Sequence, residues 1–187
     1  MSGMLVLIVG PSGSGKDTLL AGAAAALRDD PRFVFTRRVV TREAAHEDHD
    51  TATVEEFLRR QAAGDFALHW EAHGLHYGIL ESDVAGVAGE RIVVANVSRS
   101  VVAAAAARYP SCAIEITAPA DLRAARLTMR RRESDTDIET RLSRHVELNG
   151  VLRFIVMNDG TIEEGVATLL AQLTQFIAAP LPGPARS

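Results

Sequence analysis

The chain has 187 residues, enough for one domain with a large core, and 47% of them are hydrophobic, which excludes a disordered protein. The formal net charge is −4 and no basic tail or lysine-rich tract occurs, so we expect no nucleic-acid partner. A single cysteine, Cys112, excludes a disulfide within the chain and is expected in the core. With no signal peptide and no membrane-spanning apolar run, the sequence predicts a cytoplasmic protein without a membrane partner. It does not indicate an oligomeric state.

Strand-like and helix-like segments alternate along the chain, which is typical of an α/β fold with a mostly parallel sheet. Strands are predicted at residues 5–9, 33–40, 91–95, 112–117 and 152–157. Helices are predicted at residues 15–28, 53–63, 81–88, 99–108, 119–131, 137–149 and 161–178. Two short apolar runs, 66–70 and 75–79, flank a turn at 73–74 and predict a β-hairpin.

The hairpin interrupts the alternation and indicates an insertion within a single domain. We expect a core of residues 1–35 and 81–178 and an insertion of about 36–80. The proline-rich end, 179–187, is predicted to be a flexible tail.

A glycine-rich loop follows the first predicted strand and precedes the first predicted helix. In this order, backbone N–H groups can surround a polyphosphate and the positive end of the helix faces it. The loop ends in Lys16, the only lysine of the chain, which is expected to contact the β- and γ-phosphates of ATP. The other loop residues expected to hold the nucleotide are Gly10, Pro11, Ser12, Gly13, Ser14, Gly15, Asp17 and Thr18.

The loop departs from the usual pattern at Asp17, where a Ser or Thr hydroxyl commonly ligates Mg²⁺. Thr18 lies about 100° further round the helix and cannot simply replace that hydroxyl. Two interpretations remain open. Either the Asp17 carboxylate binds Mg²⁺, directly or through water, or it is an acidic residue favoured by the helix dipole.

Arginines gather at two places that suit phosphate chemistry. The first set, Arg126, Arg130, Arg131, Arg132 and Arg141, surrounds a polar break between two predicted helices, and we expect a lid at about 130–141. Arg130 and Arg141 are predicted to stabilise the charge of a transferred phosphoryl group. The second set lies in residues 37–42, where Arg38 and Arg42 predict a second anion site. The alternatives are a solvated loop and a charged strand end.

Polar residues follow the strand predicted at 91–95, where open α/β sheets bind ligands. Ser98 and Arg99 are candidate ligand contacts there, with an ordinary helix cap at Asn96 or Ser98 as the alternative. Histidines 46, 49, 69, 73 and 76 lack the spacing of a zinc site.

Taken in order, five segments resemble guanylate kinases over nearly the whole chain. They are GPSGSGK, Val40-Thr41-Arg42, Gly74-Leu-His-Tyr-Gly78, Arg126-Leu-x-x-Arg130 with Arg141-Leu142, and Asn158-Asp159. The resemblance implies a P-loop kinase fold with a monophosphate-binding insertion and an arginine lid, and it places Asn158 near the adenine. It fails where the acceptor nucleotide is recognised. Leu68 occupies the place of an acidic residue that bonds guanine, Asn96 lies where an aspartate segment is expected, and His49 replaces a tyrosine that helps to hold the acceptor phosphate. A leucine would leave the donors of guanine unpaired.

A second resemblance accommodates these departures. The segments GPSGSGKD, Glu47-Asp48-His49, Phe66-Ala-Leu-x-Trp70, His73-Gly74-Leu75-x-Tyr77-Gly78, Asn96-x-Ser98-Arg99 and Asn158-Asp159-Gly160 resemble the ribose 1,5-bisphosphate phosphokinases of phosphonate breakdown. That family implies a reaction that uses ATP and Mg²⁺ to phosphorylate the anomeric phosphate of ribose 1,5-bisphosphate. The residues expected to hold the acceptor are Arg38, Arg42, His49, Tyr77, Ser98 and Arg99. The alternatives are a nucleoside-monophosphate kinase, a sugar-hydroxyl kinase and a non-catalytic interaction module.

Overall fold

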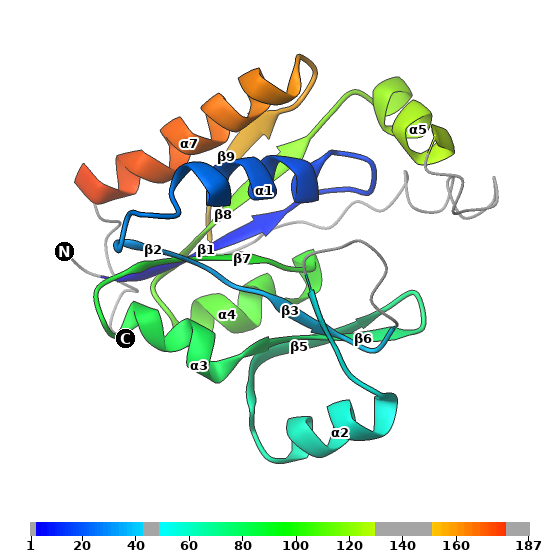
Figure 1. Ribbon diagram of the computed structural model, residues 1–187, viewed down its shortest axis with the longest axis vertical. Coiled ribbons are helices and arrows are strands. Elements are labelled where there is room, and N and C mark those ends of the chain that lie inside the picture. The colour runs from blue at the N-terminus through cyan, green and yellow to red at the C-terminus, as the bar shows by residue number, and fades with distance from the viewer. Residues whose placement is uncertain (1–2, 43–48, 130–150, 179–187) are drawn as a thin grey trace.

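The computed structural model describes residues 3–42, 49–129 and 151–178 (Figure 1). The helix predicted at 137–149, the lid predicted at 130–141 and the tail at 179–187 therefore lie outside the described residues. So does the side chain of His49.

The central sheet has five parallel strands in the order β2-β7-β1-β8-β9. They are β1 (Met4–Val9), β2 (Phe33–Phe35), β7 (Ile92–Asn96), β8 (Ser111–Thr117) and β9 (Leu152–Met157). All six residues of β1 are buried, as expected for a strand covered on both faces. The predicted α/β fold with a parallel sheet is confirmed.

Helices cover both faces of this sheet (Figure 1). Successive strand residues face opposite ways. Val6 and Ile8 accordingly pack with α1 (Lys16–Ala26) and α7 (Ile162–Ala178). Leu5 and Leu7 pack on the other face with α4 (Val102–Arg108) and α3 (Glu81–Val84).

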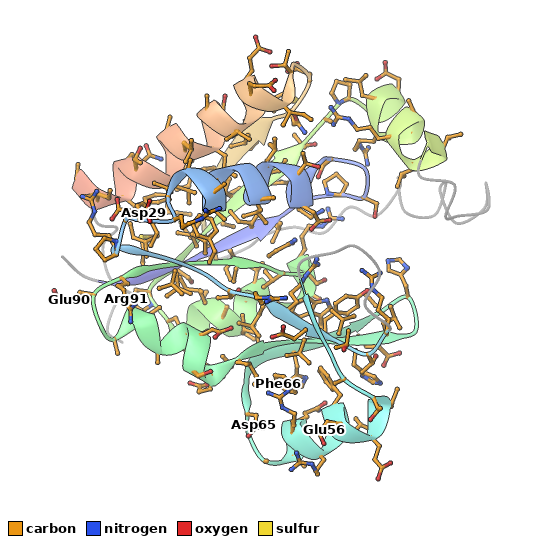
Figure 2. The ribbon with its side chains drawn as sticks, viewed as in Figure 1. Asp29, Glu56, Asp65, Phe66, Glu90 and Arg91 are labelled. Atoms are coloured by element: carbon orange, nitrogen blue, oxygen red, sulfur yellow. The ribbon has the colours of Figure 1, made fainter. Side chains whose placement is uncertain are left out.

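A second sheet of four strands, in the order β4-β3-β6-β5, lies on the side of the central sheet that carries α3 and α4 (Figure 1). It consists of β4 (His49–Thr51), β3 (Arg38–Val40), β6 (Leu75–Leu80) and β5 (Phe66–Ala72). The predicted hairpin is confirmed as β5 and β6, which turn at His73 and Gly74 with φ of 54° and 70°. Phe66, labelled in Figure 2, stacks on Phe57 of α2 (Val54–Ala62) with ring centroids 4.5 Å apart.

The prediction of a single strand at 33–40 is wrong. This segment forms two strands, β2 in the central sheet and β3 in the second sheet. The last hydrogen bond to the central sheet runs from the backbone N–H of Thr36 to the carbonyl oxygen of Val94. The two adjacent arginines, Arg37 and Arg38, have no place in a strand buried on both faces. Strand β4 was not predicted.

The remaining helices are short. The segment predicted as helix 81–88 forms α3 and the 3₁₀ turn η1 (Ala85–Val87), and the segment predicted at 99–108 begins as the 3₁₀ turn η2 (Arg99–Val101). Helix α5 spans Ala120–Met129. Across the described ranges, no helix has both the length and the apolar character needed to cross a membrane.

Candidate active site at the phosphate loop

The glycine-rich loop joins β1 to α1 and requires glycine at three of its positions. Gly10 has φ of 146°, and a Cβ there would collide with the carbonyl oxygen of Ile116. Gly13 and Gly15 have φ of 76° and 86°, in the left-handed region that side chains disfavour. A Cβ at Gly13 would also lie 2.6 Å from the carbonyl oxygen of Arg123, and one at Gly15 would collide with Nδ2 of Asn158. The loop backbone therefore packs directly on α5 and on the segment after β9.

The ammonium group of Lys16 lies over this loop. Its Nζ donates to the carbonyl oxygens of Gly10 at 2.9 Å and Pro11 at 3.2 Å. Both acceptors belong to the loop that would surround a polyphosphate. The charge is thus held at the mouth of the loop, and neutral carbonyls are weaker partners than phosphate oxygens.

Asn158 supports the loop from behind. Its side chain is only 5% exposed, and its Nδ2 donates to the carbonyl oxygen of Ser14 at 2.8 Å. Its own backbone N–H donates to Thr117 at 2.8 Å, and its carbonyl accepts from Arg126 at 3.2 Å. The sequence placed Asn158 near an adenine ring, whereas the structure gives its amide the additional task of holding the loop backbone.

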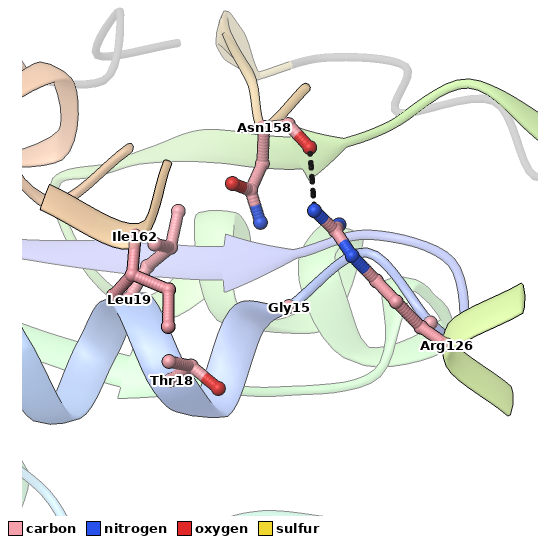
Figure 3. A pocket seen from close by; sticks show the side chains of 7 residues that line it. Gly15, Thr18, Leu19, Arg126, Asn158 and Ile162 are labelled. Atoms are coloured by element: carbon pink, nitrogen blue, oxygen red, sulfur yellow. Dashed lines mark hydrogen bonds between the residues drawn. The ribbon is translucent and has the colours of Figure 1, made fainter. Parts of the chain in front are cut away.

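A pocket of about 240 Å³ opens beside the loop (Figure 3). It is lined by Gly13, Gly15, Thr18, Leu19, Arg126, Asn158 and Ile162. Leu19 and Ile162 give it an apolar wall, while a buried guanidinium nitrogen of Arg126 has no hydrogen-bond partner among the described residues. An apolar wall with an unsatisfied donor suits a planar heterocycle.

Sequence reasoning missed Arg123, one turn of α5 before Arg126. Its Nε donates to the carbonyl of Ala118 at 3.2 Å, and a second guanidinium nitrogen is buried without a partner within the described ranges. The spacing of three residues places both arginines on one side of α5 and could have signalled this.

Asp17 links the phosphate loop to the second sheet. Its Oδ1 accepts from Nδ2 of Asn96 at 2.7 Å and from a guanidinium nitrogen of Arg38 at 3.3 Å. Asn96 ends β7 and Arg38 begins β3, so three elements meet at one carboxylate. The suggestion that Asn96 caps the next helix is wrong, because its side chain bonds Asp17.

Arg38 shares one face of the second sheet with Tyr77. Arg38 pairs with Ile79 and Val40 pairs with Tyr77, so strand alternation directs Arg38 and Tyr77 to the same side. Tyr77 stacks on Trp70 with centroids 5.4 Å apart and planes 4° apart, which fixes the ring. The predicted acceptor residues Arg38 and Tyr77 are therefore brought together.

Two other predicted acceptor residues, Arg42 and His49, lie on segments next to Arg38: Arg42 follows β3 in the sequence, and His49 begins the neighbouring strand β4. Thr41 exchanges two hydrogen bonds with His76, which fixes the backbone next to Arg42. His49 pairs in register with Arg38 on the neighbouring strand β4. Arg130 and Arg141 lie outside the described residues.

Ser98 acts as a helix cap, as one of the two interpretations predicted. Its Oγ accepts from the backbone N–H of Ser100 at 3.3 Å and from the Ser100 hydroxyl at 2.9 Å, just before Arg99 opens η2. A hydroxyl that accepts twice still has its own O–H to donate.

Cys112 lies on β8 inside the core, as predicted, and burial raises the pKa of its thiol to about 12.

Beside the core, the Glu81 carboxylate accepts from Arg108 and Tyr109, and Arg108 also donates to the Ala67 carbonyl of β5 at 2.6 Å. Burial, with the bond to Glu81, raises the pKa of the Tyr109 hydroxyl. This network joins α4 of the core to the second sheet.

Comparison with known proteins gives two kinds of relative. No protein-family model matches the chain. The ribose 1,5-bisphosphate phosphokinase PhnN of Methylobacterium radiotolerans is 47% identical over 176 residues, which cover 92% of this chain and 98% of that protein. The protein of the same name from Rhodopseudomonas palustris is 51% identical over 146 residues, which cover 77% of this chain and 75% of that protein. The crystal structure of guanylate kinase from Anaplasma phagocytophilum has a TM-score of 0.66 at 18% identity, covering 93% of this chain and 86% of that one, and shares the fold.

Proposed function

The chain belongs to the ribose 1,5-bisphosphate phosphokinase family, and we propose that it transfers the γ-phosphoryl group of ATP to the anomeric phosphate of ribose 1,5-bisphosphate. The products are ADP and 5-phospho-α-D-ribose 1-diphosphate. The observation that carries this proposal is the contact between Asp17 of the phosphate loop and Arg38 of the second sheet. It supports the proposal because the loop suited to a triphosphate then faces an arginine suited to an acceptor phosphate.

ATP is assigned to the loop and the pocket beside it. The loop amides and Lys16 hold the phosphates, and the wall formed by Leu19 and Ile162 receives the adenine together with Thr18 and Arg126. Asn158 fixes the loop backbone in the shape that these contacts need.

The acceptor is assigned to the face of the second sheet that carries Arg38 and Tyr77, with His49, Arg42 and the Ser98-Arg99 turn as further contacts. Two phosphate groups require more cationic partners than a nucleoside monophosphate does, and three arginines supply them. The insertion of about 36–80 is thus the acceptor-binding part of the domain.

Asp17 is the candidate ligand for Mg²⁺, and its surroundings fit a hard cation. Its carboxylate is 47% exposed, follows Lys16 directly and is oriented by the amide of Asn96. Held there, Mg²⁺ would supply positive charge that offsets the negative charge of the phosphoryl group being transferred.

The chemical step needs no general base. A phosphate oxygen of the acceptor is already ionised at neutral pH and forms the new bond to the γ-phosphorus, while the bond to the β–γ bridging oxygen breaks and its electrons leave with ADP. Lys16 acts on that charge from the loop. Arg130 and Arg141, in the part of the chain outside the described residues, are proposed to act on it from the lid.

Leu68 argues against guanosine monophosphate as the acceptor. Its side chain is 4% exposed and packs in an apolar cluster with Ile79 and Val97. No carboxylate is available at this position to pair with a guanine, and unpaired purine donors would oppose binding.

The test is ADP release with ATP and Mg²⁺, with ribose 1,5-bisphosphate and GMP compared as acceptors and the Lys16→Ala variant as the control for contaminating kinases. We expect release with the sugar bisphosphate alone, and none with the variant. Release with GMP alone would replace the proposal by a guanylate kinase, and failure of ATP to bind would indicate a non-catalytic module.

A further inference from the structure

The Asp17 carboxylate and the acceptor compete for one guanidinium group. Arg38 contacts Asp17 through one nitrogen and one oxygen, Oδ1, at 3.3 Å. The side chain of Arg38 is only 19% exposed, so it reaches Asp17 from within the second sheet. A single, long contact of this kind is weak compared with a bidentate arginine–carboxylate pair.

We propose that Arg38 exchanges Asp17 for an acceptor phosphate, so that acceptor binding frees the Asp17 carboxylate for the metal–nucleotide site and the two ligands bind cooperatively. This inference rests on the proposed function. It assigns Arg38 and Asn96 as positioning residues for Asp17, beyond any direct contact that Arg38 makes with the acceptor.

Charge decides the direction of the exchange. A phosphate monoester carries up to two negative charges and three terminal oxygens, whereas Arg38 contacts one oxygen of Asp17, which also accepts a hydrogen bond from Asn96. The guanidinium should therefore prefer the phosphate when it arrives.

Asn96 keeps the carboxylate in place after the exchange. Its amide lies 2.7 Å from Oδ1, shorter than the 3.3 Å contact of Arg38, and it comes from β7 of the rigid central sheet. With Arg38 gone, Asp17 stays oriented beside Lys16 but has lost its neutralising partner. A negatively charged oxygen is then available to a divalent cation.

The coupling must be reciprocal, because each ligand changes the affinity for the other by the same factor. The experiment is calorimetric titration of the Mg²⁺ complex of a non-hydrolysable ATP analogue, with and without saturating ribose 1,5-bisphosphate. In the natural protein we expect ribose 1,5-bisphosphate to lower the dissociation constant of the Mg²⁺–analogue complex by about 5- to 50-fold.

Asp17→Asn separates this mechanism from a purely structural role. Without the carboxylate charge Arg38 is no longer engaged, so the variant should bind ribose 1,5-bisphosphate about two- to fivefold more tightly when no nucleotide is present. In this variant the ratio of the dissociation constants of the analogue without and with ribose 1,5-bisphosphate should fall to about one. Arg37→Ala is the matched control, because Arg37 pairs with Asp50 of β4 instead, and the coupling should persist there.

The outcomes are distinguishable. If the natural protein binds no ribose 1,5-bisphosphate, the proposed function itself is wrong. If it binds the sugar and releases ADP but the analogue binds equally well with and without it, only the exchange is overturned. Coupling that survives in Asp17→Asn, or acceptor binding that weakens there, would overturn it as well.

Discussion

Asn158 and Ser14 are 144 positions apart in the chain, yet the Asn158 amide donates to the Ser14 carbonyl at 2.8 Å. This bond fixes the loop backbone against the segment that follows β9. Asn158→Ala should leave the carbonyl of Ser14 buried without this partner and lower the free energy of unfolding by about 1–3 kcal/mol. We expect the KM for ATP to rise as well. Thermal unfolding and steady-state kinetics measure both, with Asp159→Ala, an exposed neighbour, as the control.

Lys16 should be essential for the rate and dispensable for the fold. Its Nζ donates to the loop carbonyls of Gly10 and Pro11, and phosphate oxygens are stronger acceptors than these neutral carbonyls. Lys16→Ala should lower kcat by about 100- to 1,000-fold with little change in thermal stability. Lys16→Arg should not restore the rate, since a planar guanidinium does not replace a compact ammonium in a tight loop. A rate within threefold of the natural protein for either variant would contradict this role.

Asp17→Ser recreates the usual loop sequence and tests the metal assignment. If the carboxylate binds Mg²⁺, exchanging a charged ligand for a hydroxyl should raise the Mg²⁺ concentration at half-maximal rate by about three- to tenfold. Asp29→Ser, beyond the other end of α1, is the control and should leave that concentration unchanged (Figure 2). An unchanged Mg²⁺ dependence and rate in Asp17→Ser would favour the alternative that Asp17 only complements the helix dipole.

Cys112 should be unreactive until the protein unfolds. Burial raises its pKa from 9.0 to about 12, so the folded thiol stays protonated at pH 8. Iodoacetamide should label it only in denaturant, as mass spectrometry would detect. Above pH 9 the unfolded chain releases a proton that the folded chain keeps, so this thiol should lower the stability as the pH rises towards 12. Rapid labelling of the native protein would show that the strand opens readily.

The features predicted best from the sequence are those with a local signature. The phosphate loop, the hairpin at 66–79 and the alternation of strands and helices each follow from neighbouring residues, and the structure contains them. Long-range pairings were not predictable, because they depend on the strand order. Asp17 meets Asn96 only because β7 lies next to β1. It meets Arg38 only because the predicted strand 33–40 divides between two sheets.

Asn158 illustrates the same limit in the site. The resemblance to guanylate kinases placed it at the nucleotide, but its bond to the Ser14 carbonyl needs β9 to lie at the edge next to β8. Arg123 escaped notice because an arginine on a helix is ordinarily solvated, and its three-residue spacing from Arg126 was not used as a signal. Its packing against the backbone of Gly13 becomes visible only in three dimensions.

The measurement that tests the central claim most directly is ³¹P NMR of ribose 1,5-bisphosphate incubated with the enzyme, ATP and Mg²⁺. The proposed reaction predicts loss of the anomeric phosphate signal, two new mutually coupled diphosphate resonances and an unchanged 5-phosphate signal. A new uncoupled phosphomonoester signal would show transfer to a sugar hydroxyl instead. An unaltered sugar spectrum in the presence of an enzyme that binds ATP would contradict the assigned acceptor.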